Sequence, residues 1–251
     1  MIDTETKFFF SISSNTSNRG ARFYNTQFKK LKKNLVYIPV SITNNKKFDE
    51  FFKFLKNKNL NFAGSSVSMP FKERVLKFVD VKDKSVIKSK NANTIVLRNK
   101  KIKAFNTDFM AASLFLKKNY TKNILLIGSG ALSKSFLASG QNQNFFIYNR
   151  SKKKFLKLKS QFKNIKLVSD KSFLKCQAIS IINCTPKYSN RLKEFIKKIN
   201  INHIKYVIDC SITKNFSYLK EIATRNRIVY INGENFYRIQ RHFQKKIYLS
   251  K

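Results

Sequence analysis

The first hundred residues alternate between two hydrophobic patterns. Short apolar runs over residues 8–13, 35–40 and 61–67 predict buried strands, and the segments 21–33 and 48–55 repeat phenylalanine and leucine at near-helical spacing. This β-α-β-α-β order predicts a parallel sheet with helices over its faces.

The next segment departs from this alternation of strands and helices. Pro70 follows the third strand and predicts a helix start, because a residue in the first helical turn has no intrahelical partner for an N–H. A short helix is expected over residues 75–79, a hairpin from residues 94–97 and 102–105, and a further helix over residues 107–118.

A second unit begins with the buried strand 123–127, which leads directly into Gly128-Ser129-Gly130-Ala131. Two glycines allow a tight turn and a close approach of a diphosphate, to which the next helix presents its N–H groups. Such a pair is a weak signal alone, and Ser133 replaces the usual third glycine, but the strand before it and the helix after it strengthen it. Later strands are expected at 145–148, 165–168, 178–182, 206–209 and 228–231, with helices at 191–199, 218–224 and to about 248.

The strand at 145–148 ends in Asn149-Arg150-Ser151-Lys152-Lys153-Lys154, where no acidic residue occurs. A free ribose 2′-hydroxyl is usually bound by an acidic residue about 20 positions after the glycines. Amide, hydroxyl and cationic groups suit a 2′-phosphate instead. The run also fits a solvated helix, but its place at the strand end favours NADP over NAD.

Lys72 and Asp108 are the candidate proton-handling pair. Each lies at a strand-to-helix junction, and a carboxylate beside a lysine can hold its charge and orientation. Taken alone, the lysine fits a solvated surface and the aspartate fits a helix cap. Only their combination indicates chemistry.

Composition limits the remaining possibilities. The 251 residues, 42% of them hydrophobic, allow one large or two small domains with a proper core. Cys176, Cys184 and Cys210 form no C-x-x-C pair and indicate a reducing compartment. His203 and His242 have no neighbours at ligand spacing, so no metal site is expected.

The net charge of +39, taken alone, favours nucleic acid or an anionic membrane surface as a partner. The lysines are spread from Lys7 to Lys251, however, and the phenylalanines follow core periodicity, so a compositional origin is the better interpretation and nucleic acid is not the expected partner. No apolar run is long enough to span a bilayer, and the acidic N-terminus does not resemble a secretory signal. We expect a cytoplasmic protein without membrane association.

Several motifs together resemble the shikimate dehydrogenase family over nearly the whole chain, most closely its shikimate-dehydrogenase-like branch. They are Val67-Ser68-Met69-Pro70-Phe71-Lys72-Glu73, Asn93-Thr94, Asn106-Thr107-Asp108, Gly128-Ser129-Gly130, Asn149-Arg150-Ser151, Asn183-Cys184-Thr185, and Asn232-Gly233 with Gln240. The resemblance implies an α/β fold with an N-terminal α/β substrate-binding and catalytic domain, residues 1–105, which the C-terminal helix 234–251 completes. Residues 106–233 would form a Rossmann-type, doubly wound NADP-binding domain.

The resemblance also implies an activity and the roles of individual residues. The protein would be an NADP-dependent oxidoreductase acting on a CH–OH group, which reversibly reduces 3-dehydroshikimate to shikimate in the chorismate and aromatic amino-acid pathway. Lys72 and Asp108 would be catalytic. The substrate would contact Ser17, Ser68, Asn93 and Gln240. The cofactor would contact Gly128, Ser129, Gly130, Ala131, Asn149, Arg150, Ser151, Lys154, Thr185 and Gly233.

Two departures from the family pattern concern substrate recognition. Ile212 stands where a tyrosine is usual, and the second serine of the N-terminal pair is Asn18 or Gly20, depending on the alignment. Quinate or another cyclic hydroxy acid is therefore an alternative substrate. A monomer or a homodimer is expected.

Overall fold

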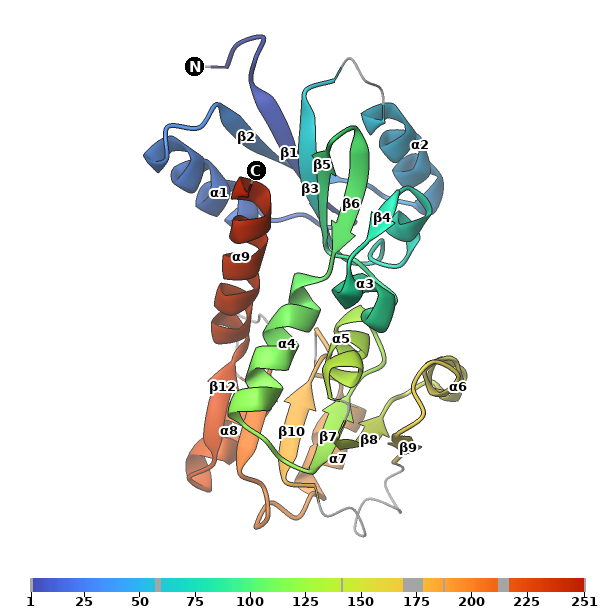
Figure 1. Cartoon of the computed structure of the whole chain (residues 1–251). Helices are drawn as coiled ribbons and strands as arrows, with labels where there is room; N and C mark the ends of the chain where they lie inside the picture. Colours follow the sequence, from blue (N-terminus) through green and yellow to red (C-terminus); the bar gives the residue numbers. More distant parts are fainter. Residues whose placement is uncertain are drawn as a thin grey trace. The chain divides into compact units, whose positions relative to one another are not determined.

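The computed structural model describes residues 2–56, 60–140, 142–168, 178–186, 188–211 and 217–250 of the chain. The chain forms two compact units, one of Met1–Thr107 with His242–Lys251 and one of Asp108–Arg241. Among the described residues, each unit is built on a six-stranded sheet (Figure 1).

The first unit has a mixed sheet with the strand order β2-β1-β3-β5-β6-β4. Its central strand β1 is parallel to β2 and β3, whereas β5 runs antiparallel to β3 and β6. Its elements are β1 (Lys7–Ser13), α1 (Arg19–Lys30), β2 (Leu35–Ser41), α2 (Asn45–Leu55), β3 (Phe62–Val67), the 3₁₀ helix η1 (Arg74–Lys77), β4 (Val81–Lys82), α3 (Lys84–Ser89), β5 (Thr94–Arg98), β6 (Lys101–Phe105) and the end of α9 (Gly233–Leu249).

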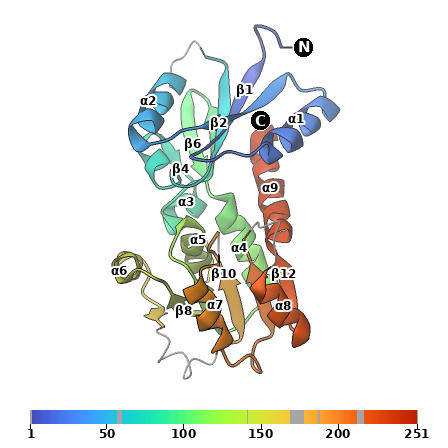
Figure 2. The same ribbon diagram turned by 180° about the vertical axis from the view of Figure 1, so that it is seen from behind.

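Both faces of this sheet are covered by hydrophobic side chains, because successive residues of a strand point to opposite faces. Phe9 of β1 packs in one cluster with Phe28 of α1 and Tyr248 of α9, and Ile12 packs in another with Phe48 of α2. Figures 1 and 2 show α1 and α2 on opposite sides of β1 and β3. The helices predicted at 21–33 and 48–55 therefore cover opposite faces.

The second unit has an entirely parallel sheet with the strand order β12-β11-β10-β7-β8-β9. The sheet extends first from β7 to β8 and then to β10 on the other side, so the carboxyl ends of β7 and β10 meet at the switch point where such sheets bind ligands. Its elements are α4 (Thr107–Lys118), β7 (Asn123–Ile127), α5 (Ala131–Ser139), β8 (Asn144–Tyr148), α6 (Lys152–Lys159), β9 (Ile165–Leu167), β10 (Ser180–Asn183), α7 (Asn190–Lys197), β11 (Tyr206–Asp209), α8 (Tyr218–Arg225), β12 (Val229–Asn232) and α9.

Helices cover both faces of this second sheet. Ile124 and Leu126 of β7 pack in a cluster with residues of α4, α5 and α9, whereas Leu125 and Ile127 pack with residues of α7 and α8. This continuous apolar strand is buried on both sides, as expected for a parallel sheet. The predicted α/β class with a doubly wound second sheet is confirmed.

The prediction that a helix starts at Pro70 is wrong. Residues 69–73 form turns, and only then does η1 follow, where a helix over residues 75–79 was expected. Phe71 is completely buried and stacks on Phe48 with ring centroids 4.4 Å apart. This packing holds residues 69–73 in turns against the core, where a regular helical turn would not bury the Phe71 ring in the same way. The short elements β4 and α3 were not predicted, because neither is long enough to show a periodic pattern.

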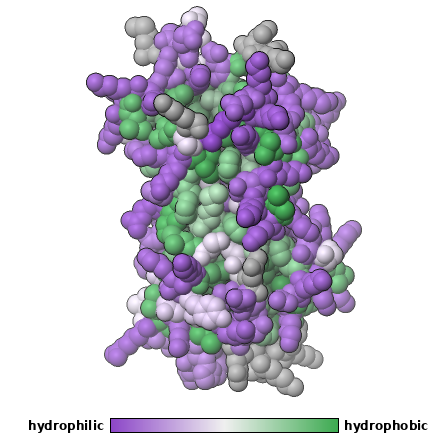
Figure 3. Space-filling model, in the orientation of Figure 1, coloured by the Kyte–Doolittle hydropathy of each residue, from purple (hydrophilic) through white to green (hydrophobic). Residues whose placement is uncertain are grey.

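None of the described helices has both the length and the apolar character that crossing a membrane requires. Figure 3 shows hydrophilic side chains distributed over the visible face of both units. This distribution agrees with lysines that occur along the whole sequence.

Candidate active site

Ser68, Lys72 and Asn93 lie on two neighbouring loops of the first unit. Ser68 and Lys72 follow β3, and Asn93 immediately precedes its antiparallel neighbour β5. The Val67 N–H donates to the Asn93 carbonyl at 3.0 Å, and the Ala92 N–H donates to the Lys72 carbonyl at 2.8 Å. These backbone hydrogen bonds bring the three predicted residues into one part of the unit.

The Asn93 side chain is buried, and hydrogen bonds to its amide oxygen fix its position. Oδ1 accepts hydrogen bonds from Thr94 Oγ1 at 2.9 Å and from the N–H and Oγ1 of Thr107 at 2.9 and 3.0 Å. Because the oxygen is engaged within the fold, Nδ2 is the atom through which Asn93 would bind a hydroxyl group.

Gln244 was not predicted, although it supports this loop directly. Its amide donates to the Asn93 carbonyl at 3.2 Å and to Thr94 Oγ1 at 2.8 Å, and its Oε1 accepts from the Tyr24 hydroxyl at 2.7 Å. Gln244 follows the predicted substrate residue Gln240 by four positions in α9, and both are buried. Their i, i+4 spacing places them on one helix face, which was the available signal in the sequence.

Ser17 lies in the exposed connection between β1 and α1. Since β1 and β3 are parallel, with Ile12 opposite Val67, Ser17 and Ser68 follow strands that end at the same edge of the sheet. Ser68 is also exposed and Lys72 is half-buried. The substrate contact of Ser17 stays a prediction.

The glycine turn lies at the switch point of the second sheet. Gly128 has φ of +103°, a conformation that favours glycine, and an added Cβ would meet Thr185 Cγ2 at 3.1 Å. Around the Cβ position of Gly130 no described atom lies within 4 Å, and α5 begins at the next residue. This open space at a helix N-terminus fits an anionic diphosphate.

Asn149 connects the glycine turn with the end of β8. Its Oδ1 accepts from Ser129 Oγ at 2.9 Å, and its Nδ2 donates to the Ser151 carbonyl at 2.7 Å. Ser151 caps α6 by accepting from the Lys154 N–H at 3.3 Å, while the side chains of Arg150 and Lys154 are exposed. The structure therefore brings the predicted residues of both strand ends together, with the two cations at the surface.

The Asp209 cluster, which comprises Asp209 and the residues that donate to it, joins β10, β11 and β12 with the connections that follow β10 and β11. The Asp209 side chain is buried and accepts six hydrogen bonds. Oδ1 accepts from Asn183 Nδ2 at 3.0 Å and from the N–H and Oγ of Ser211 at 3.1 and 2.7 Å, and Oδ2 accepts from the Tyr188 hydroxyl at 2.6 Å, Ser217 Oγ at 2.6 Å and the Tyr230 hydroxyl at 3.2 Å.

These hydrogen bonds keep the carboxylate charged. Burial alone would raise the pKa of Asp209, but the hydrogen bonds from Ser217, Tyr188 and Ser211 together outweigh it and place the pKa below its ordinary value. Burial, and then the Asp209 charge, raise the pKa of the Tyr230 hydroxyl to about 12, so the tyrosine stays a neutral donor.

The Asp209 cluster contacts two predicted cofactor residues that are not part of it, Thr185 and Gly233. Asn183 donates to Asp209 and accepts, through Oδ1, from the N–H and Oγ1 of Thr185 at 3.0 and 2.7 Å. A Cβ on Gly233 would meet the carbonyl oxygens of Ser211 and Asp209 at 2.6 and 3.2 Å, so only glycine fits beside this backbone. Thr185 and Gly233 are thereby both positioned by Asp209 and its neighbours.

Asp108 lies buried in the first turn of α4. Burial raises the pKa of the Tyr237 hydroxyl well above its ordinary value, and the charge of Asp108 raises it further. Tyr237, which was not predicted, is therefore a neutral hydroxyl whose titration is governed partly by Asp108. Ile212, the departure from the family pattern, lies outside the described residues, as does Cys176.

Comparison with known proteins supports one family. A model of the shikimate dehydrogenase substrate binding domain matches residues 17–95. A shikimate dehydrogenase (NADP(+)) of Clostridium botulinum is 32% identical over 206 residues, which cover 76% of this chain and 77% of the relative. A shikimate dehydrogenase-like protein of Haemophilus influenzae is 31% identical over 58% of this chain, and the match spans only 53% of that protein.

The fold has close counterparts among solved structures. The crystal structure of shikimate dehydrogenase from Aquifex aeolicus superimposes with a TM-score of 0.81 and covers 99% of this chain and 94% of its own, at 24% sequence identity. At this identity the likeness concerns the fold.

Proposed function

This chain belongs to the shikimate dehydrogenase family, and we propose that it is an NADP-dependent shikimate dehydrogenase that reversibly reduces 3-dehydroshikimate to shikimate. The observation that carries the proposal is the Gly128 turn at the switch point of a parallel sheet, with the cations Arg150 and Lys154 exposed just beyond the neighbouring strand. The Clostridium botulinum relative, named as an NADP(+)-dependent shikimate dehydrogenase, supports the same activity.

The open space beside Gly130 supports the assignment of the dinucleotide to this turn. Residues 128–131 would hold the diphosphate at the start of α5, and Asn149, Arg150, Ser151 and Lys154 would bind the 2′-phosphate. Thr185 and Gly233 would line the nicotinamide end. When bound, NADPH supplies the hydride that reduces the substrate carbonyl carbon.

The chain's own residues would handle the proton and orient the ring. The Lys72 ammonium group donates a proton to the carbonyl oxygen during reduction, and the neutral amine takes it back from the hydroxyl during oxidation. Asp108 would orient the Lys72 side chain through their opposite charges. Hydrogen bonds from Ser17, Ser68, Asn93 and Gln240 hold the substrate carboxylate and ring hydroxyls. A cytoplasmic location and a monomer or homodimer remain predictions.

Replacing Lys72 by alanine tests the assignment. We expect kcat with shikimate and NADP to fall by about 10²- to 10⁴-fold, the usual contribution of a proton-transfer group. The dissociation constant for NADP should not change, because no cofactor contact is removed. Lys77→Ala, which removes an exposed lysine of η1, is the matched control. Wild-type turnover in folded Lys72→Ala would refute the proposed mechanism.

A further inference from the structure

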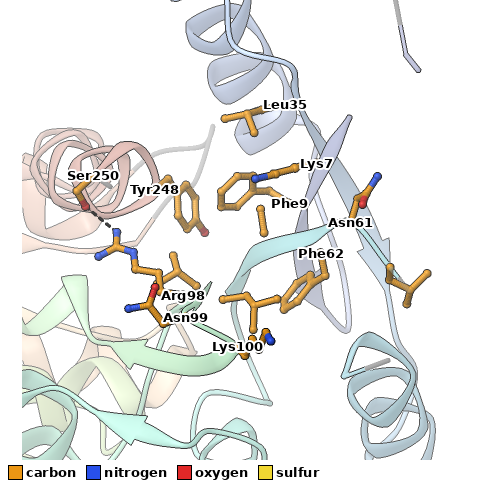
Figure 4. Close-up of a pocket in the computed structure, with 14 residues that line it drawn as sticks. Lys7, Phe9, Leu35, Asn61, Phe62, Arg98, Asn99, Lys100, Tyr248 and Ser250 are labelled. Atoms are coloured by element: carbon orange, nitrogen blue, oxygen red, sulfur yellow. Dashed lines mark hydrogen bonds between the residues drawn. The ribbon is translucent and has the colours of Figure 1, made fainter. Parts of the chain in front are cut away.

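A cavity of about 470 Å³ lies in the first unit, away from the loops that carry the candidate substrate residues (Figure 4). Lys7 and Phe62, which begin β1 and β3, line it. Ser68 follows the other end of β3, and at a rise of about 3.3 Å per residue it lies roughly 20 Å from Phe62. The cavity is therefore separate from the loops of Ser68 and Lys72.

One wall of the cavity is aromatic. Phe9 and Tyr248 line it from one face of the sheet, together with the aliphatic Leu35 (Figure 4). The rings of Phe9 and Tyr248 pack at a centroid distance of 4.5 Å. A cavity of this volume is within the range of small-molecule sites, and such a wall suits a flat apolar body.

Arg98 supplies a fixed positive charge at this wall. Its Nη2 donates to the Ile247 carbonyl and to Ser250 Oγ, the latter at 2.6 Å, so the guanidinium group is held at the end of α9 (Figure 4). The guanidinium group has five N–H donors in all, and those on its other nitrogens suit a carboxylate. Lys7 and Lys100 add further positive charge, and none of the described lining residues is acidic.

The hairpin turn between β5 and β6 presents Lys100 from a defined backbone. Asn99 and Lys100 have φ of 50° and 60°, the combination found in tight two-residue hairpin turns. Glycine is strongly favoured at the second of these positions, so Lys100 occupies it against the local backbone preference. This conformation is set by the turn and does not depend on a ligand.

We propose that this cavity binds a small carboxylate with an aromatic body. The ring packs against Phe9 and Tyr248, and the carboxylate faces Arg98 and Lys100. Both parts are needed, because a chain of net charge +39 attracts any anion weakly and an apolar wall alone selects no charge. The proposal concerns binding and does not depend on the enzymatic activity.

The test is a titration of the full-length, isotopically labelled protein with 3-phenylpropionate, followed through backbone amide NMR signals. We expect saturable shifts at Lys7, Asn99, Lys100 and Ser250 with a dissociation constant of about 1 mM, as is usual for so small a ligand. The uncharged 3-phenylpropanamide, which has the same shape, should bind at least about fivefold more weakly. Equal affinity for the amide, or shifts centred on Ser68 and Asn93, would overturn the proposal.

Two variants locate the binding. Lys100→Gly should weaken it about threefold, the size of one exposed charge contact, without destabilising the fold, because glycine suits φ of 60°. Lys90→Gly is the matched control, since Lys90 also has a left-handed backbone, with φ of 56°, and does not line the cavity. Ala63→Trp, which adds volume on the face of Phe9 and Tyr248, should abolish binding by filling the space. Equal weakening by both glycine variants, or unchanged binding to Ala63→Trp, would contradict the assignment.

Discussion

Replacing Asp209 by asparagine removes the charge at the centre of the Asp209 cluster and nearly keeps the volume of the side chain. Three of the six hydrogen bonds are short, those from Tyr188 and Ser217 at 2.6 Å and that from Ser211 Oγ at 2.7 Å. The amide places a donor where one carboxylate oxygen accepts, and the remaining oxygen is a neutral acceptor.

The expected loss follows from these three bonds. A hydrogen bond to a charged group contributes about 1.5–3 kcal/mol and a neutral one about 0.5–1.5 kcal/mol, so each short bond loses about 1 kcal/mol. The unfolding free energy of Asp209→Asn should therefore fall by about 3 kcal/mol. Tyr230→Phe is the matched variant: it removes only the long contacts of one hydroxyl, to Asp209 at 3.2 Å and to Ser217 Oγ at 3.3 Å, and should lose about 1 kcal/mol or less.

Urea unfolding followed by circular dichroism measures both losses. The folded pKa of Asp209 lies below its ordinary value of 3.8, so the charged form stabilises the fold above that value, and this contribution disappears as the pH falls through the folded pKa. The difference between wild type and Asp209→Asn should accordingly narrow in acid. Equal stability at neutral pH, or a difference that does not change with pH, would refute this account of the cluster.

Three further substitutions test other parts of the structure. Arg150→Ala should raise the KM for NADP by about tenfold or more and leave that for NAD nearly unchanged, as initial rates with each cofactor will show, because an ionic contact to the 2′-phosphate is lost. Gln244→Ala should lower the unfolding free energy by about 2–3 kcal/mol in urea, since it removes the buried hydrogen bonds that Gln244 makes with Tyr24, Thr94 and the Asn93 carbonyl. Gly128→Ala should cost about 1–2 kcal/mol of stability through its left-handed backbone and weaken NADP binding in a fluorescence titration.

The sequence predicted best those elements whose pattern is local. In the strand 123–127 the four residues after Asn123 are apolar and buried on both faces, and the hairpin around Asn99 and Lys100 pairs as expected. The helix start predicted at Pro70 was wrong because the burial of Phe71, a tertiary effect, overrides the helical preference of the residues that follow Pro70. The six-residue α3 is too short for any periodic signal.

The Asp209 cluster could not be predicted from the sequence, because its residues are far apart along the chain. Tyr188 and Ser217 come from the connections after β10 and β11, Tyr230 lies in β12, and only the parallel pairing of these strands brings the three hydroxyl groups to one carboxylate. The glycine turn, in contrast, was recognisable because its constraints lie in consecutive residues. The sequence therefore allowed a dinucleotide site to be predicted at the glycine turn, but it did not show how that edge of the sheet is held together.

The most direct test of the proposed function is an initial-rate measurement on the purified wild-type protein. Shikimate and quinate are each supplied with NADP and with NAD, and the absorbance of the reduced nicotinamide is followed. We predict the highest kcat/KM for shikimate with NADP. If folded protein did not reduce NADP with shikimate, or clearly preferred quinate or NAD, the proposed NADP-dependent shikimate dehydrogenase activity would be contradicted.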